Sequence, residues 1–322
     1  MRPVVCFGEA LIDFVCTDGA REPRAFEQHA GGAPANVAVA IASLGGASEF
    51  AGMLANDPFG DFLLASLTRA GVGTALVRRT SVAPTALAFV ALDANGERSF
   101  SFYRPPAADL LYTAGDFDAD ALARAHAFHA CSNSLTEAAI AATTIAGMAL
   151  ARGAGALVSF DLNLRPALWY AGVDPLPRAW EALAGADLVK LSVEEMEFLA
   201  AGAGSESAVL ARLWRGATRL VVVTHGAAPL RWFSRGAAGT LDWFRVATVD
   251  TNAAGDAFMG GLLFQLATRG VRAAGLDGFI ADRESFAAAL RFAAACGALA
   301  TTRHGAFGAM PKRAEVEALL ES

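Results

Sequence analysis

Hydrophobic and polar positions follow two different patterns along this chain. Short apolar runs predict strands at 4–8, 156–160, 188–191 and 220–224. Longer amphipathic or alanine-rich stretches predict helices at 35–44, 60–70 and 254–269 and from residues 285 and 313. Strands that alternate with helices predict an α/β fold whose mainly parallel sheet has helices on both faces.

Two further segments read as hairpins with no helix beside them. Residues 86–103 look like two strands joined at Asn95-Gly96, a dipeptide typical of tight turns. With extended stretches at 14–16 and 26–29, this hairpin predicts a small separate sheet that acts as a lid. The second hairpin, 230–233 with 241–244, is expected at the far edge of the main sheet. We therefore expect one domain over 1–322, with lid segments at about 13–30 and 84–108.

Composition and charge exclude several classes of protein. The 322 residues are 54% hydrophobic and 18% charged, which is typical of a globular chain. The net charge is −6 and no basic stripe is present, which argues against nucleic acid as a partner. No apolar run reaches the roughly 18 residues needed to cross a bilayer, and no signal-peptide pattern opens the chain. We expect a cytoplasmic protein with no membrane association.

The positions of the cysteines and lysines argue against several kinds of metal and nucleotide site. The four cysteines lie far apart, without the spacing of a metal site, and predict free thiols. Lys190 and Lys312 are the only lysines, and neither belongs to a GxxxxGK[ST] phosphate loop. No GxGxxG follows the first strand either. Two large classes of nucleotide-binding protein are therefore poor matches.

The strongest chemical signal is the segment 250–258, DTNAAGDAF. A strand-like stretch at 245–249 leads into a turn of small residues that begins an amphipathic helix. The N–H groups at such a helix start have no partner within the helix and attract anions, here those of Ala253, Ala254 and Gly255. Asp256, in the same turn, could accept a proton from a hydroxyl beside the anion. Alternatively, Asp256 only complements the helix dipole.

This segment resembles the C-terminal signature DT-x-[GA]-A-G-D-x-F of the ribokinase-like (PfkB) carbohydrate kinases. Residues 31–38, GGAPANVA, resemble the N-terminal signature GG-x-x-x-N-x-A of that family, and 8–13 resembles its opening strand and sugar-binding aspartate. Further ordered matches lie at 57–60, 161–165, 221–226 and 303–311. The resemblance implies a ribokinase-like three-layer core with a small β-sheet lid, and transfer of phosphate from ATP, with Mg²⁺, to a sugar.

The resemblance also implies roles for individual residues. Asp256 would be the general base, and the amides of Ala253, Ala254 and Gly255 would stabilise charge on the γ-phosphoryl group. The sugar would be held by residues of the first signature and its neighbours, namely Asp13, Gly31, Gly32 and Asn36.

For the nucleotide and its metal, the matches are looser. Thr224 and Gly226 match a T-x-G nucleotide loop, Ala294 lies where helix residues flank the adenine, and Lys190 could neutralise phosphate. Ser192 and Glu195 stand where the family has N-x-x-E, whose glutamate organises the Mg²⁺ water shell. Serine replaces asparagine here, and Ser-x-x-Glu is also a helix capping box, so both interpretations stay open.

A monovalent cation, such as K⁺, binds beside the anion site in many relatives, largely through carbonyl groups. The matching positions in this chain are Asp250, Asn252, Ala300, Arg303 and Gly305. The resemblance therefore implies a possible K⁺ site.

Two stretches bear on the choice of sugar. Residues 102–109 resemble the R-x-x-x-A-D lid stretch of bacterial fructokinases, and we expect lid closure to bring Arg104 over the sugar. Residues 161–169 resemble D-x-N-x-R-x-x-L-W, which fructokinases share with 2-keto-3-deoxygluconate kinases, and Arg165 could bind either substrate.

The resemblance favours an ATP-dependent fructokinase that makes fructose 6-phosphate and ADP. The alternatives are a 2-keto-3-deoxygluconate kinase, then a ribokinase or nucleoside kinase, and, from another class, a sugar-binding regulator without catalysis. Because an exposed lid edge offers unpaired strand groups, we also expect a homodimer through the lids.

Overall fold

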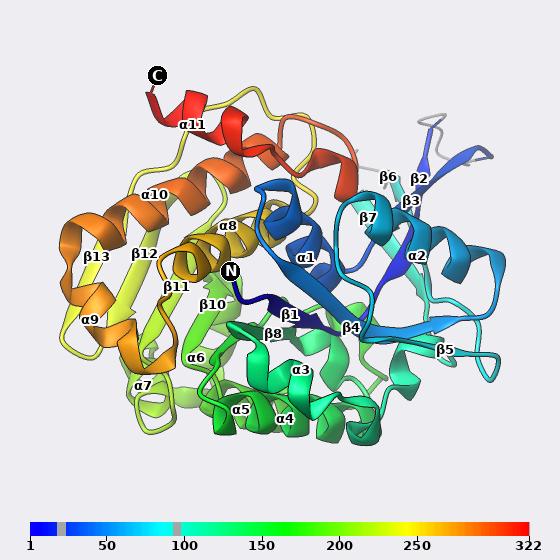
Figure 1. Cartoon of the computed structure of the whole chain (residues 1–322), viewed down its shortest axis with the longest axis horizontal. Coiled ribbons are helices and arrows are strands. Elements are labelled where there is room, and N and C mark those ends of the chain that lie inside the picture. The colour runs from blue at the N-terminus through cyan, green and yellow to red at the C-terminus, as the bar shows by residue number, and fades with distance from the viewer. Residues whose placement is uncertain (18–23, 93–97, 322) are drawn as a thin grey trace.

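Two β-sheets of different size organise the molecule (Figure 1). The structure is a computed structural model that describes residues 1–17, 24–92 and 98–321. Within these residues the large sheet has nine strands, in the order β13 (Ala237–Leu241), β12 (Ala228–Ser234), β11 (Leu220–His225), β10 (Leu188–Ser192), β9 (Leu157–Asp161), β8 (Ala127–Cys131), β1 (Val4–Phe7), β4 (Ser48–Ala55) and β5 (Val77–Thr80). The strands from β11 to β5 in this order are parallel, whereas β12 is antiparallel to both its neighbours, β11 and β13. This confirms the mainly parallel sheet and a hairpin at its far edge, but the second strand of that hairpin is Ala237–Leu241 and not the predicted 241–244.

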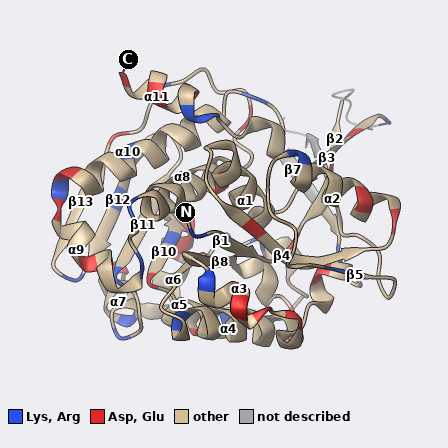
Figure 2. Cartoon of the chain, in the orientation of Figure 1, with Lys and Arg blue, Asp and Glu red and all other residues tan. Residues whose placement is uncertain are grey.

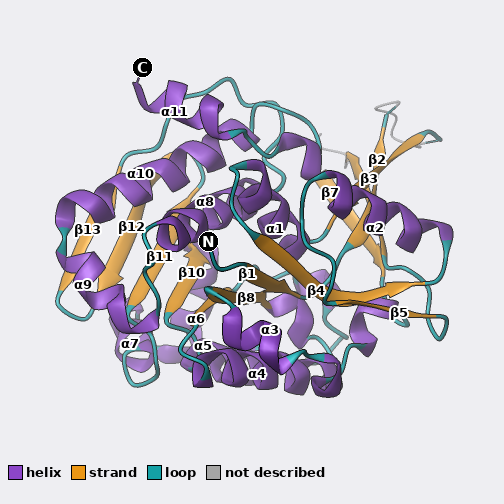
Figure 3. Ribbon diagram, in the orientation of Figure 1, coloured by secondary structure: helices purple, strands orange, loops and turns teal. Residues whose placement is uncertain are grey.

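Helices cover both faces of the large sheet (Figure 3). One face carries α1 (Ala33–Ser43), α2 (Pro58–Arg69), α8 (Ala254–Thr268), α9 (Leu276–Ala281) and α10 (Arg283–Ala300), with α11 (Arg313–Glu321) against α10. The other carries α3 (Ala119–Arg124), α4 (Ala138–Gly153), α5 (Leu176–Ala184), α6 (Val193–Ala203) and α7 (Glu206–Leu213). In β1, Val4 and Cys6 belong to the first core, and Val5 and Phe7 to the second. A strand buried on both faces explains why its sequence is continuously apolar.

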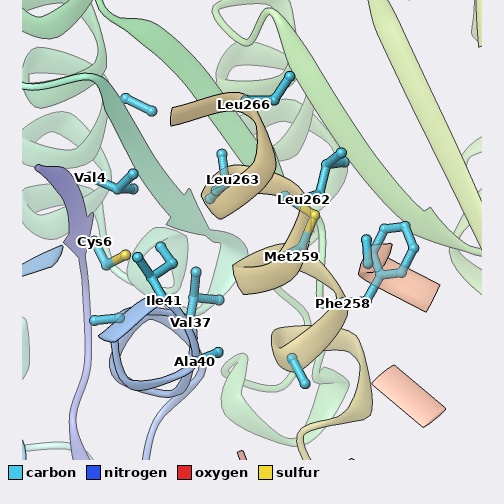
Figure 4. Packing of buried hydrophobic residues seen from close by; sticks show 14 of the residues in the cluster. Val4, Cys6, Val37, Ala40, Ile41, Phe258, Met259, Leu262, Leu263 and Leu266 are labelled. Carbon is cyan, nitrogen blue, oxygen red and sulfur yellow. The ribbon is translucent and has the colours of Figure 1, made fainter. Parts of the chain in front are cut away.

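Close packing of α1 on α8 brings together their first turns (Figure 4). Val37 and Ile41 of α1 belong to the same buried cluster as Met259 of α8. A Cβ at Gly260 would lie 2.4 Å from the Cβ of Ala40, so only glycine permits this approach. The helix starts that carry the two signature motifs are therefore fixed side by side.

The small sheet has the order β3 (Phe26–Gly31), β2 (Leu11–Cys16), β6 (Leu87–Leu92) and β7 (Arg98–Tyr103). β2 pairs with β3 and β6 with β7 in antiparallel fashion, whereas β2 and β6 are parallel. This confirms the separate sheet and the hairpin predicted at 86–103. The Asn95-Gly96 turn lies outside the described residues.

One predicted strand is wrong. The stretch 245–249 forms no strand, although its pattern is apolar and polar in turn. The backbone N–H groups of Val249 and Asp250 instead donate to the carbonyl of Thr301, at the end of α10. The chain therefore reaches the helix start of α8 through a loop.

Two properties of the whole chain complete this description. In the ranges that the structure describes, no helix is long and apolar enough to cross a membrane. Figure 2 shows acidic and basic residues interspersed over the visible face.

Candidate active site

A cavity of about 520 Å³ opens beside the carboxyl ends of the central strands. Asp161 ends β9, Ser192 ends β10, and Thr224 lies near the end of β11; all three line it. The first turns of α1 and α8 close one side, and Asp13 and Phe102 reach it from the small sheet. Ligands of open α/β sheets bind at this edge of the strands.

The start of α8 forms an anion site within this cavity. Ala253 precedes the helix with a φ of +57°, and no side chain of the described residues caps this end. Its first N–H groups therefore lack intrahelical partners, although the Ala254 N–H makes a long contact of 3.5 Å with the carbonyl of Thr251, before the helix. The Lys190 ammonium lies beneath them, because a Cβ at Gly255 would be only 3.1 Å from its Nζ. Helix dipole and ammonium together favour a negatively charged group at this point.

Lys190 is itself held by Asp161. Its Nζ donates to the two carboxylate oxygens at 2.8 and 3.0 Å, and both side chains are buried. Burial lowers the pKa of Lys190, but the charges of Asp161 and Glu195 outweigh it, so the net pKa is raised and the side chain stays charged. The sequence-predicted phosphate-neutralising lysine thus lies next to the anion site.

Asp256 lies beside this anion site. It lies in the first turn of α8, and its Oδ2 accepts a hydrogen bond of 2.8 Å from Nδ2 of Asn36. Burial, and next the charge of Asp161, raise its pKa to about 7, against the opposing effects of Asn36 and Lys190. A carboxylate with a pKa near neutrality accepts a proton more readily than an ordinary aspartate.

Asp13 lines the cavity near the two glycines of the first motif. Burial and the charges of Asp256, Glu9 and Asp250 raise the pKa of Asp13 to about 7. A Cβ at Gly31 would lie 2.2 Å from Oδ2 of Asp13, and one at Gly32, whose φ is +108°, would lie 2.5 Å from the carbonyl oxygen of Glu9. Both positions therefore require glycine for the Asp13 carboxylate and the start of α1 to approach.

Several residues that line the cavity were not among the predicted site residues, and Glu9, Asn133 and Asp161 are the polar ones buried deepest in it. Glu9 follows β1, and its Oε1 accepts hydrogen bonds of 2.9 Å from the Ala33 N–H and from Nδ2 of Asn133. Glu9 and Asp161 belong to matched motifs, and a charged residue at the carboxyl end of a buried strand could have revealed them. No pattern in the sequence singles out Asn133.

The capping interpretation of Ser192 and Glu195 is confirmed. The Ser192 Oγ accepts from the Glu195 N–H at 3.2 Å, and Oε2 of Glu195 accepts from the Ser192 N–H at 2.8 Å. Oε1 of Glu195 accepts from the Leu164 N–H at 2.7 Å. Both residues still line the cavity, as do Arg165 and Thr224.

Three predicted contacts are not found in the structure. Arg104 is 2% exposed and is not on the cavity wall, because its guanidinium is bound to Asp109 and Asn133 in the interior. Ala294 is fully buried in the core that contains α8, so it cannot flank a nucleotide in this structure. Gly226, with a φ of +49°, lies in the exposed turn after β11 and does not line the cavity.

Part of the predicted cation site is assembled. Oδ1 of Asp250 accepts from the Asn252 N–H at 2.7 Å, and Oδ2 accepts from the Gly305 N–H at 3.1 Å. The side chain of Arg303 pairs with Glu315 instead, and Ala300 is buried at the end of α10. Within the described residues no cluster of three or more His, Cys, Asp or Glu side chains could hold a metal ion.

Comparison with known proteins gives full-length matches. A family model described as pfkB family carbohydrate kinase matches residues 1–313. Fructokinase-1 of Zea mays is 41% identical over 321 residues, which cover 99% of this chain and 97% of the maize protein. The crystal structure of a fructokinase with bound ATP from Xylella fastidiosa has a TM-score of 0.96 and 55% identity and covers 99% of this chain and 98% of that one.

A more distant structure, the fructokinase of Vibrio cholerae O395 with bound fructose, ADP and calcium ion, is 34% identical, with a TM-score of 0.85 and 99% of both chains covered. A double mutant of the same protein, with the same identity and TM-score, was solved in a form with fructose, ADP and potassium ion; the match covers 99% of this chain and 98% of that one.

Proposed function

This chain belongs to the pfkB family of carbohydrate kinases and is a sugar kinase, and we propose that it transfers the γ-phosphoryl group of ATP to the 6-hydroxyl of D-fructose. The products are fructose 6-phosphate and ADP. The observation that carries this proposal is the buried Asp256 carboxylate beside the uncapped start of α8. The choice of fructose is supported by full-length similarity to fructokinases and by the relative whose structure holds fructose and ADP.

The reaction needs one proton acceptor and one site for negative charge. Asp256 takes the proton of the sugar hydroxyl as the hydroxyl oxygen forms its bond to the γ-phosphorus. The bond from that phosphorus to the β,γ-bridging oxygen breaks, and its electrons leave with ADP. The N–H groups of Ala253, Ala254 and Gly255, with Lys190 beneath them, stabilise the charge on the transferred group.

The two substrates enter from opposite ends of the cavity. The sugar lies against Asp13, Gly32 and Asn36, whose carboxylate and amide groups bind hydroxyls, under the small sheet that serves as the lid. The nucleotide lies toward Thr224 and Asn252 at the other end. This arrangement aims the sugar hydroxyl and the γ-phosphoryl group at the first turn of α8.

The charges around the cavity also fit a divalent cation. Burial and the nearby charge of Asp161 raise the pKa of Glu195, and Asp161 also raises that of Asp256, so carboxylates crowd this wall. Mg²⁺ keeps several water ligands besides substrate phosphates, and Glu195, whose own oxygens accept from Ser192 and Leu164, would hold it through that water shell. Mg²⁺ bound to ATP neutralises the charge of the phosphates during transfer.

A K⁺ site beside the α8 turn is part of the same proposal. It would use carbonyl groups of the segments around Asp250, Asn252 and Gly305, and the hydrogen bonds of the Asp250 carboxylate to the N–H groups of Asn252 and Gly305 support it. The potassium-bound relative supports it. A single domain over 1–322 and a homodimer are further proposals, and a cytoplasmic location stays a prediction.

An ADP-release assay with fructose, ribose, 2-keto-3-deoxygluconate and adenosine tests the proposal. We expect the highest kcat/KM with fructose. A clear preference for 2-keto-3-deoxygluconate would replace fructokinase with keto-sugar-acid kinase, and no turnover with any acceptor would favour a sugar-binding regulator.

Asp256→Asn tests the assignment of the base. We expect kcat to fall by roughly 10²- to 10⁴-fold while ATP still binds, because the amide cannot accept the proton. Asp277→Asn, which alters an exposed carboxylate in the first turn of α9, is the matched control and should leave kcat unchanged. Near-normal turnover by Asp256→Asn would overturn the assignment.

A further inference from the structure

The chain passes between the large and the small sheet at four points (Figure 1). Glu9 lies on the passage from β1 to β2, and Ala33 follows the passage from β3 to α1. The third passage leads from β5 into β6, and Arg104 stands on the fourth, immediately after β7. Any movement of the small sheet over the cavity must bend these four segments.

Arg104 and Asp109 form a buried ion pair at the fourth passage. Nε and Nη2 of Arg104 donate to Oδ2 of Asp109 at 2.8 and 2.5 Å, and both side chains are only 2% exposed. The two residues are the first and last of the R-x-x-x-A-D stretch, so the ends of that motif bind each other. Within the same stretch, the Ala108 N–H donates to the carbonyl of Pro84 at 2.8 Å, which ties the fourth passage to the third.

The pair is linked to the cavity through Asn133. Nη1 of Arg104 donates to the backbone carbonyl of Asn133 at 2.6 Å, and Nδ2 of Asn133 donates to Oε1 of Glu9 at 2.9 Å. The same oxygen of Glu9 accepts from the Ala33 N–H, directly after the sugar-binding Gly32. Hydrogen bonds thus run from the fourth passage to the first and second without interruption, and Asn133 and Glu9 line the cavity.

We propose that Arg104 and Asp109 are positioning residues for sugar phosphorylation, which fix the base of the small sheet so that Asp13 and Phe102 keep their spacing from Asn133 and Glu9 around the sugar. Neither residue touches the sugar in this arrangement. The inference rests on the sugar-kinase activity but holds for whichever sugar the enzyme prefers.

Physical chemistry favours this role over a purely stabilising one. Burying an ion pair costs the hydration of both charged groups. Apolar residues of similar size often stabilise a fold just as much as such a pair does, so stability alone does not explain the pair. The planar guanidinium, however, binds Asp109 with one edge and the Asn133 carbonyl with another, which fixes the angle between the two segments. A lysine at this position would keep the charge but would lose that angle.

Steady-state kinetics of Arg104→Lys and Asp109→Asn test the proposal, with the sugar that gives the highest kcat/KM in the acceptor panel. We expect KM for the sugar to rise at least tenfold in each variant, while KM for ATP changes less than twofold, because the nucleotide end of the cavity is not part of the network. The double variant should be little worse than either single one, since both remove the same contact.

A second ion pair provides the control. Arg152 and Asp187 pair at 3.2 Å at the start of β10, at the edge of the sheet opposite the cavity, and Asp187 is completely buried. Arg152→Lys and Asp187→Asn should lower thermal stability and leave KM for the sugar within twofold of the parent.

The proposal is wrong if the variants at 104 and 109 raise KM for the sugar no more than these controls do. It is also wrong if they raise KM for ATP as much as KM for the sugar. If Arg104→Lys does not fold, Asp109→Asn decides alone. Because the panel selects the sugar first, an error in the choice of fructose does not affect this result.

Discussion

At the scale of single residues, the cavity brings buried carboxyl groups together, and ionising them lowers the free energy of unfolding. Asp13 and Asp256 both have a pKa raised to about 7, chiefly by burial. In the unfolded chain an aspartate has a pKa near 3.9. The folded state therefore binds these protons more tightly, and the free energy of unfolding falls as the pH rises from about 4 to about 7.

Asp13→Asn should consequently stabilise the protein at high pH. An amide removes the cost of the buried charge, which by linkage amounts to about 4 kcal/mol at most. We expect its melting temperature to exceed that of the parent by several degrees at pH 8 and to match it closely at pH 4.5, while KM for the sugar rises. Calorimetry at both pH values checks this, with Asp277→Asn as a control that should show no such difference. An equal shift at both pH values would contradict the expected linkage.

At the scale of elements, some helices of the described chain begin with a side-chain cap that stabilises the fold, whereas the helix at the proposed catalytic site begins without one. Asp57 caps α2, where its Oδ1 accepts from the Gly60 N–H at 2.7 Å, and Ser192 caps α6. The start of α8 has no side-chain cap from the described residues. The starts of α4 and α5 have no such side-chain cap either, but the start of α8 lines the cavity beside Lys190, so the anion site lies at α8.

Asp57 also binds Thr85, so replacing Asp57 removes more than a helix cap. Its carboxylate also accepts from the N–H of Thr85 at 2.8 Å and from its hydroxyl at 2.7 Å, just before β6. Against the effect of burial, these bonds and that of Gly60 hold the pKa of Asp57 below its ordinary value. The cap therefore also joins α2 to a passage into the small sheet.

We expect Asp57→Ala to lower the free energy of unfolding by about 2 to 4 kcal/mol, since a cap and two further hydrogen bonds are lost. Urea denaturation measures the change. Asp118→Ala is the matched control, because Asp118 caps α3 by accepting the Ala121 N–H at 2.9 Å, and the loss of this cap should cost about 1 kcal/mol. Equal losses in the two variants would mean that the link to Thr85 contributes nothing.

At the scale of the whole molecule, the small sheet leaves β3 and β7 as its outer strands. Outer strands offer backbone groups that a second copy can pair with, and such pairing closes a symmetric dimer. The proposed homodimer would use these strands, and each lid would then be supported by its partner.

Light scattering at micromolar concentration should give twice the chain mass of 33.3 kDa. Glu27→Lys, on the exposed part of β3, should weaken the dimer because lysine on an outer strand opposes pairing. Ala238→Lys, exposed on β13 at the edge of the large sheet, is the control and should leave it intact. A monomeric parent, or a dimer disrupted only by Ala238→Lys, would refute a dimer through the lids.

Local patterns in the sequence were sufficient for much of the architecture. The run of apolar residues in β1 and the strands from β9 to β11, the helix starts at α1 and α8, and the two hairpins all follow from side-chain periodicity and turn residues. β4, β5 and β8 were not predicted, because glycine or charged and polar residues interrupt their apolar runs: Gly52 in β4, Arg78 and Arg79 in β5, and His129 in β8. The stretch 245–249 shows the reverse error, since a strand pattern forms no strand without a neighbouring strand to pair with.

By itself, the sequence determined the order of the elements and the turn that carries Asp256, because these depend on residues close together in the chain. Only the tertiary structure decided which distant groups meet. Asn36 and Asp256 are 220 residues apart and bind each other because Gly260 lets α8 approach α1. Arg104, expected over the sugar, instead finds Asp109 and the Asn133 carbonyl in the interior. A buried guanidinium must satisfy its donors within the protein, and which acceptors surround it depends on how the two sheets pack, which no local pattern records.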